Sequence, residues 1–248
     1  GRIHADINPV RGSGRGTVTG RFSYSNPNLQ QIPARNKQLG PLIRSLFLPE
    51  EKYKWGCFDY SQQEPRLVVH FAAKSQFISK EESVIAIVEK FKEESVDFHQ
   101  LVADMAHIER DQAKTINLGL FYGMGKTKLQ AELGVSKDKA DELFKKYHSQ
   151  VPFVKQLMNA VMKRAQESGK IRTLLGRVCR FPLWEPAQFG IHKALTHEEA
   201  LREHGPGIKR AYTYKALNRL IQGSAADMTK KAMLELYNEG ITPHIQVH

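Results

Sequence analysis

The sequence predicts an α+β fold in which a helical block is inserted between parts of one antiparallel sheet. The first observation is a mostly apolar run at residues 53–60 and an alternating one at residues 241–248, which predict strands. The second is the helical spacing of apolar side chains from residue 80 to residue 168, and again over residues 215–240. The order strand, helices, strand is typical of an α+β domain.

Shorter elements connect these segments. Leu67, Val68 and Phe71 predict a helix over residues 66–73. The stretch GKIRTLLGRVCRFP, residues 169–182, predicts a hairpin with its turn near Gly176. Gly240 stands where a capping glycine would end the long helix. Residues 1–40, rich in Gly, Ser, Arg, Asn and Pro, predict an extended basic surface segment.

Composition indicates a basic protein with a polyanionic partner. The 248 residues include 37 Lys and Arg against 26 Asp and Glu, a formal net charge of +11. A merely soluble basic protein is the alternative. No apolar run reaches the length of a membrane span, about 18 residues, so no membrane association is expected. Cys57 and Cys179 have the spacing of neither a disulfide framework nor a metal site, which favours a cytoplasmic setting.

Asp59 follows the apolar run of residues 53–60. A carboxylate at a strand end is a natural ligand for Mg²⁺, which prefers carboxylates together with substrate phosphates. An ordinary strand-terminating Asp is the alternative. Glu64 also has a structural interpretation, because Ser61-x-x-Glu64 matches a capping box, although Pro65 counts against it.

Four residues of ERDQAKTINLGLFYGMG recur at a spacing of four: Arg110, Lys114, Leu118 and Tyr122. On a helix they share one face, with two cations followed by an apolar and an aromatic side chain. Two cations a turn apart suit a triphosphate, and the apolar end suits a flat base. The alternative is a core helix whose basic ends reach solvent.

Glycines in the same stretch need a separate explanation. Gly119 and Gly123 are poor helix formers, so they predict a close approach by another backbone or a ligand. The sequence GMGKT, residues 123–127, resembles a phosphate-binding loop, but Leu120 stands where that pattern requires glycine, and we reject it.

Residues 128–144 leave open a helix-turn-helix, with Gly134 in the turn and Ser136 capping the second helix. That second helix is acid-rich, with Asp138, Asp141 and Glu142, which suits a DNA groove poorly. Asn218 and Gln222, four residues apart on the helix over 215–240, predict amide contacts to the minor groove, where all base pairs present acceptors. A polar helix face is the alternative.

Five stretches, in order along almost the whole chain, resemble the polymerase domain of family A DNA polymerases. They are TGRFSYSNPNLQQIP (19–33), DYSQQEPR (59–66), RDQAKTINLGLFYG (110–123), NRLIQGSAAD (218–227) and IQVH (245–248). The resemblance implies a right-hand fold: residues 1–72 and 209–248 form the palm, with an incomplete antiparallel sheet, and residues 73–208 form the helical fingers. It also implies template-directed DNA synthesis on primer-template DNA, from deoxynucleoside triphosphates.

The resemblance assigns roles to matching positions. Asp59 binds both catalytic Mg²⁺ ions. Nucleotide contacts fall to Gln62, Glu64, His99, Arg110, Lys114, Leu118 and Tyr122, with Arg110 and Lys114 on the triphosphate, Tyr122 near the templating base and Glu64 excluding a ribose 2′-hydroxyl. The DNA contacts fall to Arg21, Asn218, Gln222 and His248.

Family members continue after the position of His248 with Asp-Glu, and that Asp is the second metal ligand. We therefore expect this sequence to be an inactive fragment of a polymerase. Three positions depart from the family pattern. Leu118 replaces Phe or Tyr, Gln63-Glu64-Pro65 replaces the commoner Ile-Glu-Leu, and Tyr214 replaces Arg. These departures favour a phage-like member.

Two other functions remain open. One is a non-catalytic DNA-binding module, either a regulator using residues 128–144 or a polymerase remnant that only grips duplex. The other is a single-subunit RNA polymerase, against which Glu64 argues because such an enzyme has no need to exclude a 2′-hydroxyl. The host, the fidelity, a proofreading exonuclease and a processivity factor stay undetermined.

Overall fold

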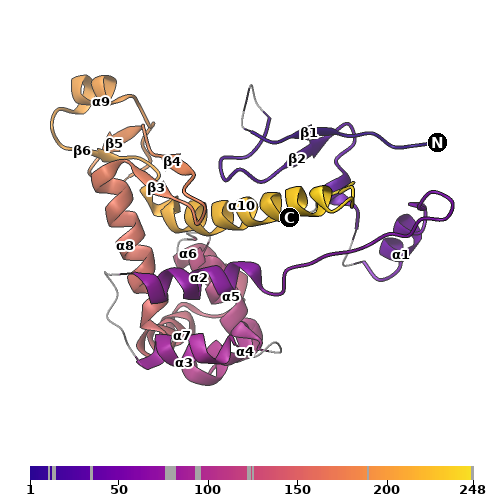
Figure 1. The fold of residues 1–248 in the computed structure, drawn as a ribbon. Coiled ribbons are helices and arrows are strands. Elements are labelled where there is room, and N and C mark those ends of the chain that lie inside the picture. The colour runs from indigo at the N-terminus through magenta and orange to yellow at the C-terminus, as the bar shows by residue number, and fades with distance from the viewer. Residues whose placement is uncertain are drawn as a thin grey trace. The chain divides into compact units, whose positions relative to one another are not determined.

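The structure is a computed structural model of the chain (Figure 1). It describes all residues except 11, 13, 14, 34, 35, 76–81, 93–95, 122, 123, 125, 189, 247 and 248, and residues 82 and 83 by their backbone alone. The chain divides into two compact units, one of Gly1–Ser61 with Ala226–His248 and the other of Gln62–Ala225. Each unit is described by itself below.

The helices and strands follow in chain order. They are β1 (Asp6–Asn8), β2 (Ser23–Ser25), η1 (Leu29–Gln31), α1 (Leu39–Arg44), α2 (Gln63–Lys74), α3 (Glu82–Lys90), α4 (Phe98–Ala106), α5 (Arg110–Phe121), α6 (Lys126–Leu133), α7 (Lys137–Gln150), α8 (Pro152–Ser168), β3 (Lys170–Arg172), β4 (Val178–Arg180), β5 (Trp184–Pro186), α9 (His197–His204), β6 (Ile208–Arg210), η2 (Thr213–Lys215) and α10 (Ala216–Asn238). Among the described residues the strands pair antiparallel in three two-stranded sheets: β1–β2, β3–β4 and β5–β6.

The Gln62–Ala225 unit is built on packed helices. Helix α4 packs against α5 and α7, and α5 also contacts α6 and α8. Their apolar faces meet in an aromatic core whose largest members are almost fully buried: Phe98, Phe121, Tyr147 and Phe153. The ring centroids of Phe98 and Phe121 lie 6.3 Å apart, a contact that fixes α4 beside the end of α5. Burying these side chains supplies most of the free energy that holds the helices together.

A hairpin of β3 and β4 joins α8 to the rest of this unit. Gly176 adopts a φ of +87° in its turn, a conformation that disfavours any side chain. The backbone N–H of Leu174 donates to Ser224 Oγ (2.9 Å), and Arg177 Nη2 donates to the Gly223 carbonyl (3.0 Å). The hairpin is therefore attached to the first part of α10.

Helix α9 lies between β5 and β6 in the sequence and contacts both strands. The Trp184 ring on β5 contacts the His197 ring, with centroids 4.6 Å apart, and the Arg210 guanidinium, 4.5 Å from the Trp184 centroid. Thr196 and Glu199 form a reciprocal capping box at the start of α9. These contacts give the segment from Trp184 to Arg210 a small fold of its own.

The other unit holds β1, β2, η1, α1, the second part of α10 and the residues after it. Tyr24 is buried, and its hydroxyl accepts a hydrogen bond from the Gln246 backbone N–H (3.1 Å). Gln30 Nε2 donates to the carbonyls of Phe22 and Gln246, both at 3.1 Å. Side chains of the β2–η1 segment therefore hold residue 246 in place.

Two predicted strands are wrong. Residues 53–60 are exposed throughout and form no strand, and residues 241–246 form none either. A strand needs a neighbour to satisfy its backbone N–H and C=O groups, and no described residue pairs with either segment in a ladder. Helix α2 begins at Gln63 with Gln62, in the left-handed region, as its N-cap, so Ser61 does not occupy the N-cap position that the alternative interpretation of Glu64 requires.

The other predicted elements are confirmed. The α+β class, the helix over 66–73, the helical block, the hairpin at Gly176 and the long helix ending before Gly240 are all present. The helix pair at 128–144 also forms, with Ser136 Oγ accepting from the Lys139 N–H at 3.3 Å. Among the described residues, no helix is long and apolar enough to cross a membrane.

Candidate functional site

Asp97 begins helix α4 and organises the residues around it. Its Oδ1 accepts hydrogen bonds from the backbone N–H groups of His99 (2.8 Å) and Gln100 (3.1 Å). These donors have no partner within the helix, so the carboxylate caps it and also interacts favourably with the helix dipole. The cap fixes the start of α4 and with it the backbone of His99.

The second oxygen of Asp97 binds Arg110. Nη2 and Nε of Arg110 donate to Asp97 Oδ2 at 2.6 Å and 3.0 Å, and the side chains of Arg110 and Asp97 remain 43% and 38% exposed. Burial raises the pKa of Asp97, but hydrogen bonds from Arg110 and from the two backbone N–H groups outweigh it and lower the pKa overall. Arg110 is thus held at the start of α5 by an ion pair that solvent still reaches.

His99 lies in the first turn of α4, and its side chain is half-buried. Its Nδ1 is 3.2 Å from Nδ2 of Asn117 on α5, and the Asn117 Oδ1 accepts a short hydrogen bond from the Tyr147 hydroxyl on α7. Asn117 and Tyr147 are fully buried. Burial lowers the pKa of His99, and the positive charges of Arg110 and Lys114 lower it further against the opposing effect of Asp97. Three helices therefore hold a neutral imidazole in one orientation.

Gln62 connects α2 to the same segment. Its Oε1 accepts from the Phe98 N–H at 2.7 Å, and its Nε2 donates to the Val96 carbonyl. Gln62 itself has a φ of +52°, in the left-handed region. Both ends of its amide are engaged with the backbone on either side of Asp97, so Gln62 fixes the chain where α4 begins.

The remaining predicted residues of this unit lie on α5 and α2. Lys114 is exposed one turn after Arg110, and Leu118 is half-buried one turn later. Tyr122, and with it Gly123, lies outside the described residues. Glu64 is half-buried in the first turn of α2. The structure thus brings Gln62, His99 and Arg110 together around Asp97 and gives α5 the cationic face that the spacing predicts.

Gly119 explains how α5 meets α6. A Cβ at Gly119 would lie 2.7 Å from Leu129 Cδ1, and Leu129 is buried. The sequence predicted another backbone or a ligand against this glycine, and the structure places the Leu129 side chain of α6 there instead.

Asn218 and Gln222 lie on the first part of α10, and both are half-buried. Ser224, two residues after Gln222, is fully buried and donates from Oγ to the Leu220 carbonyl at 2.7 Å. With the bond that Ser224 accepts from Leu174, this anchors the hairpin beside the two amides.

Asp59 and Arg21 belong to the other unit. Asp59 is exposed, and Phe58 and Tyr60 beside it are 69% and 48% exposed. Arg21 is half-buried in the turn before β2, where its carbonyl accepts from Thr17 Oγ1 at 2.9 Å. His248 lies outside the described residues.

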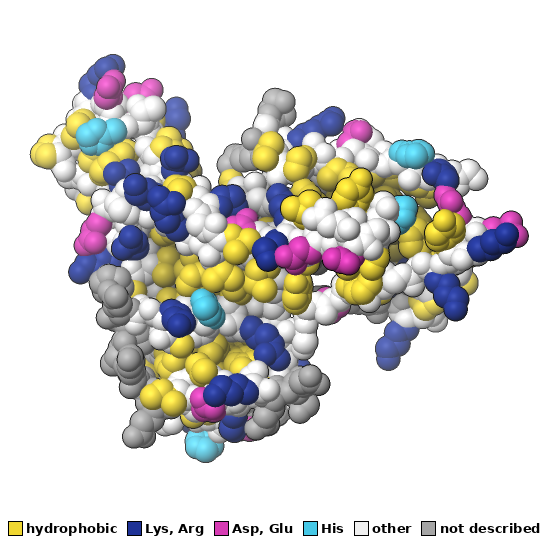
Figure 2. All heavy atoms as spheres, viewed as in Figure 1, with side chains coloured by type: hydrophobic (Ala, Val, Ile, Leu, Met, Phe, Trp, Pro, Cys, Tyr) yellow, Lys and Arg dark blue, Asp and Glu magenta, His cyan; other side chains and the backbone are white. Residues whose placement is uncertain are grey.

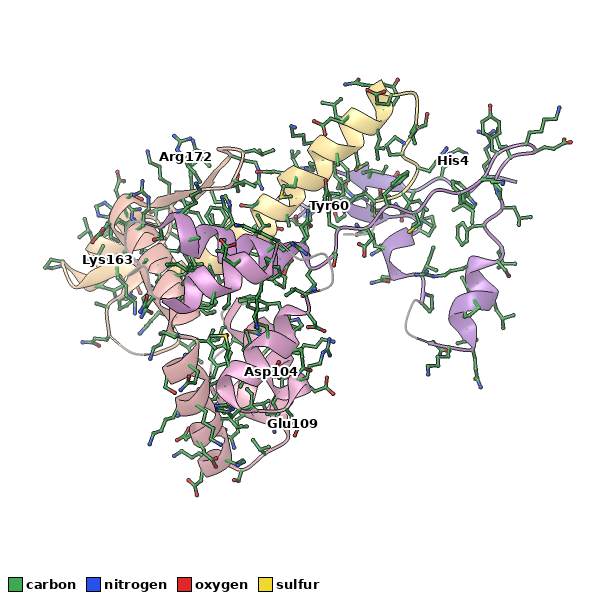
Figure 3. All side chains as sticks on the ribbon, turned by 60° about the horizontal axis from the view of Figure 1, so that its bottom comes forward. His4, Tyr60, Asp104, Glu109, Lys163 and Arg172 are labelled. Atoms are coloured by element: carbon green, nitrogen blue, oxygen red, sulfur yellow. The ribbon has the colours of Figure 1, made fainter. Side chains whose placement is uncertain are left out.

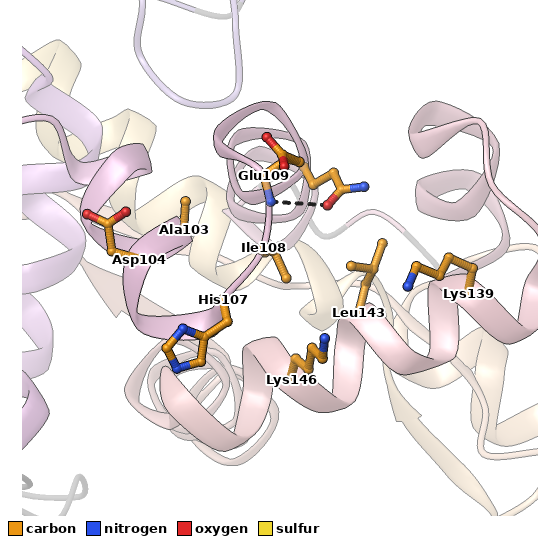
Figure 4. A pocket seen from close by; sticks show the side chains of 9 residues that line it. Ala103, Asp104, His107, Ile108, Glu109, Lys139, Leu143 and Lys146 are labelled. Atoms are coloured by element: carbon orange, nitrogen blue, oxygen red, sulfur yellow. Dashed lines mark hydrogen bonds between the residues drawn. The ribbon is translucent and has the colours of Figure 1, made fainter.

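A wide hollow of about 580 Å³ lies between α4, α5 and α7 (Figure 4). It is lined by Ala103, Asp104, His107, Ile108, Glu109, Gln112, Lys139, Leu143 and Lys146. None of the predicted site residues lines it. Its charges are largely engaged already, because Lys139 and Lys146 pair with Glu142 and Asp104 accepts from Gln100. Figure 3 labels Asp104 and Glu109 on this part of the chain.

The geometry around α4 and α5 suits the binding of a polyanion. Arg110 and Lys114 present two positive charges to solvent one turn apart, and the guanidinium is held in position by Asp97. The His99 imidazole beside them adds a polar group without adding a charge.

The family model described as DNA polymerase family A matches residues 1–248. The chain belongs to DNA polymerase family A. The DNA-directed DNA polymerase of Pseudomonas phage M6 is 33% identical over 100% of this chain and 41% of its own length. DNA polymerase I of Caldicellulosiruptor bescii is 32% identical over 96% of this chain and 25% of its own length.

A solved structure, the POL domain of Pol1 from M. smegmatis in complex with DNA primer-template and dNTP, has a TM-score of 0.71 and 28% identity. The match covers 100% of this chain and 40% of that one. This family A chain thus spans well under half the length of the relatives it matches. The predicted family resemblance is confirmed.

Three residues of the site were missed from the sequence. Asp97 carries a local signal, since an acceptor side chain three residues before Gln100 is typical of a helix start. Its pairing with Arg110, thirteen residues away, has no such signal. Asn117 and Tyr147 are linked to His99 only by the packing of α4, α5 and α7.

Proposed function

We propose that this chain provides nucleotide and DNA contacts for template-directed DNA synthesis, in which a primer 3′-hydroxyl attacks a deoxynucleoside triphosphate by two-metal phosphoryl transfer. The observation that best supports this function is the cationic pair Arg110 and Lys114 beside the neutral His99, on a chain that belongs to DNA polymerase family A. The bound primer-template and dNTP of the M. smegmatis neighbour support both partners.

Arg110 and Lys114 bind the triphosphate in this proposal. Phosphate oxygens accept charge-assisted hydrogen bonds, and a guanidinium can donate two of them at once. The Asp97 ion pair holds the Arg110 guanidinium at the start of α5, where phosphate oxygens can replace the carboxylate as its acceptor. His99, held by Asn117, donates a further hydrogen bond from its free ring nitrogen, and Gln62 positions this segment.

The base and sugar are assigned to neighbouring positions. Leu118 packs on the sugar, Tyr122 lies near the templating base and Glu64 excludes the ribose 2′-hydroxyl. Leu118 is half-buried one turn beyond Lys114, which supports an apolar contact there. Arg21, Asn218, Gln222 and His248 contact DNA. Residues 1–72 and 209–248 then serve as palm and residues 73–208 as fingers.

Mg²⁺ is the metal of the proposed reaction, and Asp59 fits one ligand position. The residue is exposed, and Mg²⁺ binds through one or two carboxylates while taking its other ligands from water and substrate phosphates. Among the described residues no group of three His, Cys, Asp or Glu side chains is placed to hold a metal. When bound, the ion would neutralise the negative charge that develops on the phosphates.

Binding of a dNTP tests the proposal directly. With primer-template present, Lys114→Ala should weaken dNTP affinity roughly 10- to 100-fold, the loss expected for one charge-assisted contact. Lys128→Ala, which removes an exposed cation from α6, is the matched control and should leave affinity unchanged. Equal affinities for the two variants would contradict the assignment of Lys114.

The regulator alternative has no specific observation in its favour. The second helix of the 128–144 pair, α7, engages its acids with lysines: Asp141 pairs with Lys126, and Glu142 with Lys139 and Lys146. Three acids on α7 offset its four lysines, two of which pair with Glu142, so the helix presents little net positive charge to a DNA backbone.

A further inference from the structure

A second, smaller hollow lies within the Gln62–Ala225 unit between α2, α8, β3 and α10, with a volume of about 190 Å³. Its floor is apolar and its rim is basic. The floor consists of Phe71, Val161, Ile171 and Leu220, and the rim of Arg164, Lys170 and Arg172. We call this the α8–β3 hollow.

Its three cations are available to a ligand. Among the described residues, no carboxylate forms an ion pair with Arg164, Lys170 or Arg172, and Glu167 pairs instead with Lys163. Arg172 donates one hydrogen bond, from Nη1 to the Gly176 carbonyl at 3.1 Å, which leaves Nη2 for another acceptor. All three side chains are exposed.

The surrounding surface has the same sign of charge. Residues 163–180 contain six Lys and Arg and a single Glu. Figure 2 shows Lys and Arg side chains gathered over α8 and the β3–β4 hairpin beside hydrophobic atoms, and Figure 3 labels Lys163 and Arg172 on this part of the chain. Such a patch attracts a polyanion over a distance of about 10 Å at moderate salt.

The α8–β3 hollow faces away from the amides proposed for the minor groove. Successive residues on a helix are separated by about 100°, so Leu220 lies about 160° around α10 from both Asn218 and Gln222. Leu220, in the floor, is therefore on the opposite side of α10 from that pair. A duplex held by Asn218 and Gln222 does not occupy it.

The size and chemistry of the hollow select the ligand. Sites for whole small molecules measure roughly 300–1,000 Å³, so this one fits part of an extended chain. We propose that it binds single-stranded DNA, with backbone phosphate on Arg164, Lys170 and Arg172 and one base against the apolar floor. Cations along the backbone and an apolar surface under a base are the two elements of sequence-independent strand binding. An acidic peptide would use the cations but leave the floor exposed to water.

The test is fluorescence anisotropy of a labelled oligothymidylate on the 248-residue chain, titrated at several salt concentrations with saturating unlabelled blunt-ended duplex. The site variant is Arg164→Ala/Lys170→Ala/Arg172→Ala. The matched control, Lys128→Ala/Lys137→Ala/Lys145→Ala, removes the same charge from exposed positions on α6 and α7. Circular dichroism melting checks that both variants fold, and Arg172→Gln alone serves if the triple variant does not.

The site variant should bind the strand at least ~10-fold more weakly than the control. Its slope of log affinity against log salt should be smaller by roughly 0.7 for each phosphate that the three side chains neutralise in the parent chain. Equal affinity and slope in the two variants would overturn the proposal. So would equal displacement of the strand by polyglutamate of matched charge, which would assign the hollow to acidic peptides.

An abasic oligonucleotide of the same length tests the floor. The parent chain should bind it more weakly than oligothymidylate, by about 1–3 kcal/mol, that is roughly 5- to 150-fold, if one base stacks or packs there. Equal binding would overturn the placement of a base in the hollow. Duplex affinity, measured separately, reports on the proposed function, so failure of one proposal is distinguishable from failure of the other.

Discussion

The two carboxylate oxygens of Asp97 are divided between two tasks: Oδ1 caps helix α4, and Oδ2 binds Arg110 with a 2.6 Å contact to Nη2. One side chain thus sets both the start of the helix that carries His99 and the position of a cation proposed to bind triphosphate. An incoming phosphate must compete with Oδ2 for that guanidinium.

Asp97→Asn separates these two tasks. Asparagine also caps helices well, so α4 should keep its start, while the ion pair and its negative charge are lost. We expect thermal stability to change little and dNTP affinity to rise several-fold, since an exposed ion pair contributes about 1 kcal/mol or less. Isothermal titration measures the affinity. Asp97→Ala, which also removes the cap, should cost a further 0.5–2 kcal/mol, roughly, in denaturant unfolding. Weaker dNTP binding by Asp97→Asn would mean that the pair positions Arg110 more than it competes.

The pKa of His99 should report charge at the site. Burial lowers it first, Arg110 and Lys114 lower it further, and Asp97 raises it. Lys114→Ala should therefore raise this pKa, Asp97→Asn should lower it, and a bound triphosphate should raise it by adding negative charge. Proton NMR titration of the imidazole measures all three, with Lys128→Ala as the unchanged reference.

The same shift makes stability depend on pH. Because the folded pKa of His99 lies below the usual value of about 6.5, its contribution to stability is fully present above that pH and is lost as pH falls through the lowered pKa. A His99→Gln variant should lose this component of the pH dependence between the two values. An unchanged profile would contradict it.

Local pattern was enough to predict the helices, because each buries a stripe that its own periodicity records. The spacing that predicts α2 comes from Leu67, Val68 and Phe71 within that helix. The face from Arg110 to Leu118 likewise lies within α5 alone. The prediction of a strand over residues 53–60 was wrong because a strand depends on a partner elsewhere in the chain. An apolar run is also compatible with an extended segment that has no such partner.

The sequence predicted individual residues of the site but not the hydrogen bonds that link them. His99 and Arg110 were found from their motifs, but Asp97, Asn117 and Tyr147, which hold them, come from three separate helices. Such contacts arise from the packing of α4, α5 and α7, and spacing along the chain carries no record of them. The left-handed backbone of Gln62, which aims its amide at α4, was equally invisible.

The buried Tyr147 hydroxyl should contribute to stability through its hydrogen bond to Asn117. It is the buried donor to Asn117, so Tyr147→Phe leaves the Asn117 oxygen without that partner at an expected cost of about 1–3 kcal/mol. Tyr237→Phe, at a site 63% exposed, should cost nearly nothing and controls for loss of a hydroxyl. Urea unfolding compares the two. Similar midpoints would show that Asn117 finds another donor. In the same variant the released Asn117 should loosen His99, broadening its imidazole resonances.

Gly119→Ala should destabilise the chain although alanine is the better helix former. Its Cβ would lie 2.7 Å from Leu129 Cδ1 and 3.0 Å from Cδ2, and Leu129 is buried. Overpacking costs about 1–3 kcal/mol, which exceeds or offsets the roughly 1 kcal/mol gained in helix propensity.

A double-mutant cycle isolates that contact. In a Leu129→Val background, which removes both Cδ atoms, Gly119→Ala should become neutral or stabilising, with a coupling of at least ~1 kcal/mol in urea unfolding. Gly207→Ala, at a position with no atom within 4 Å of the added Cβ, is the reference for glycine replacement alone and should show no such coupling. If Gly119→Ala is equally costly in both backgrounds, Leu129 is not what requires glycine at this position, and the approach of α6 to α5 would have to be limited by the helix backbones.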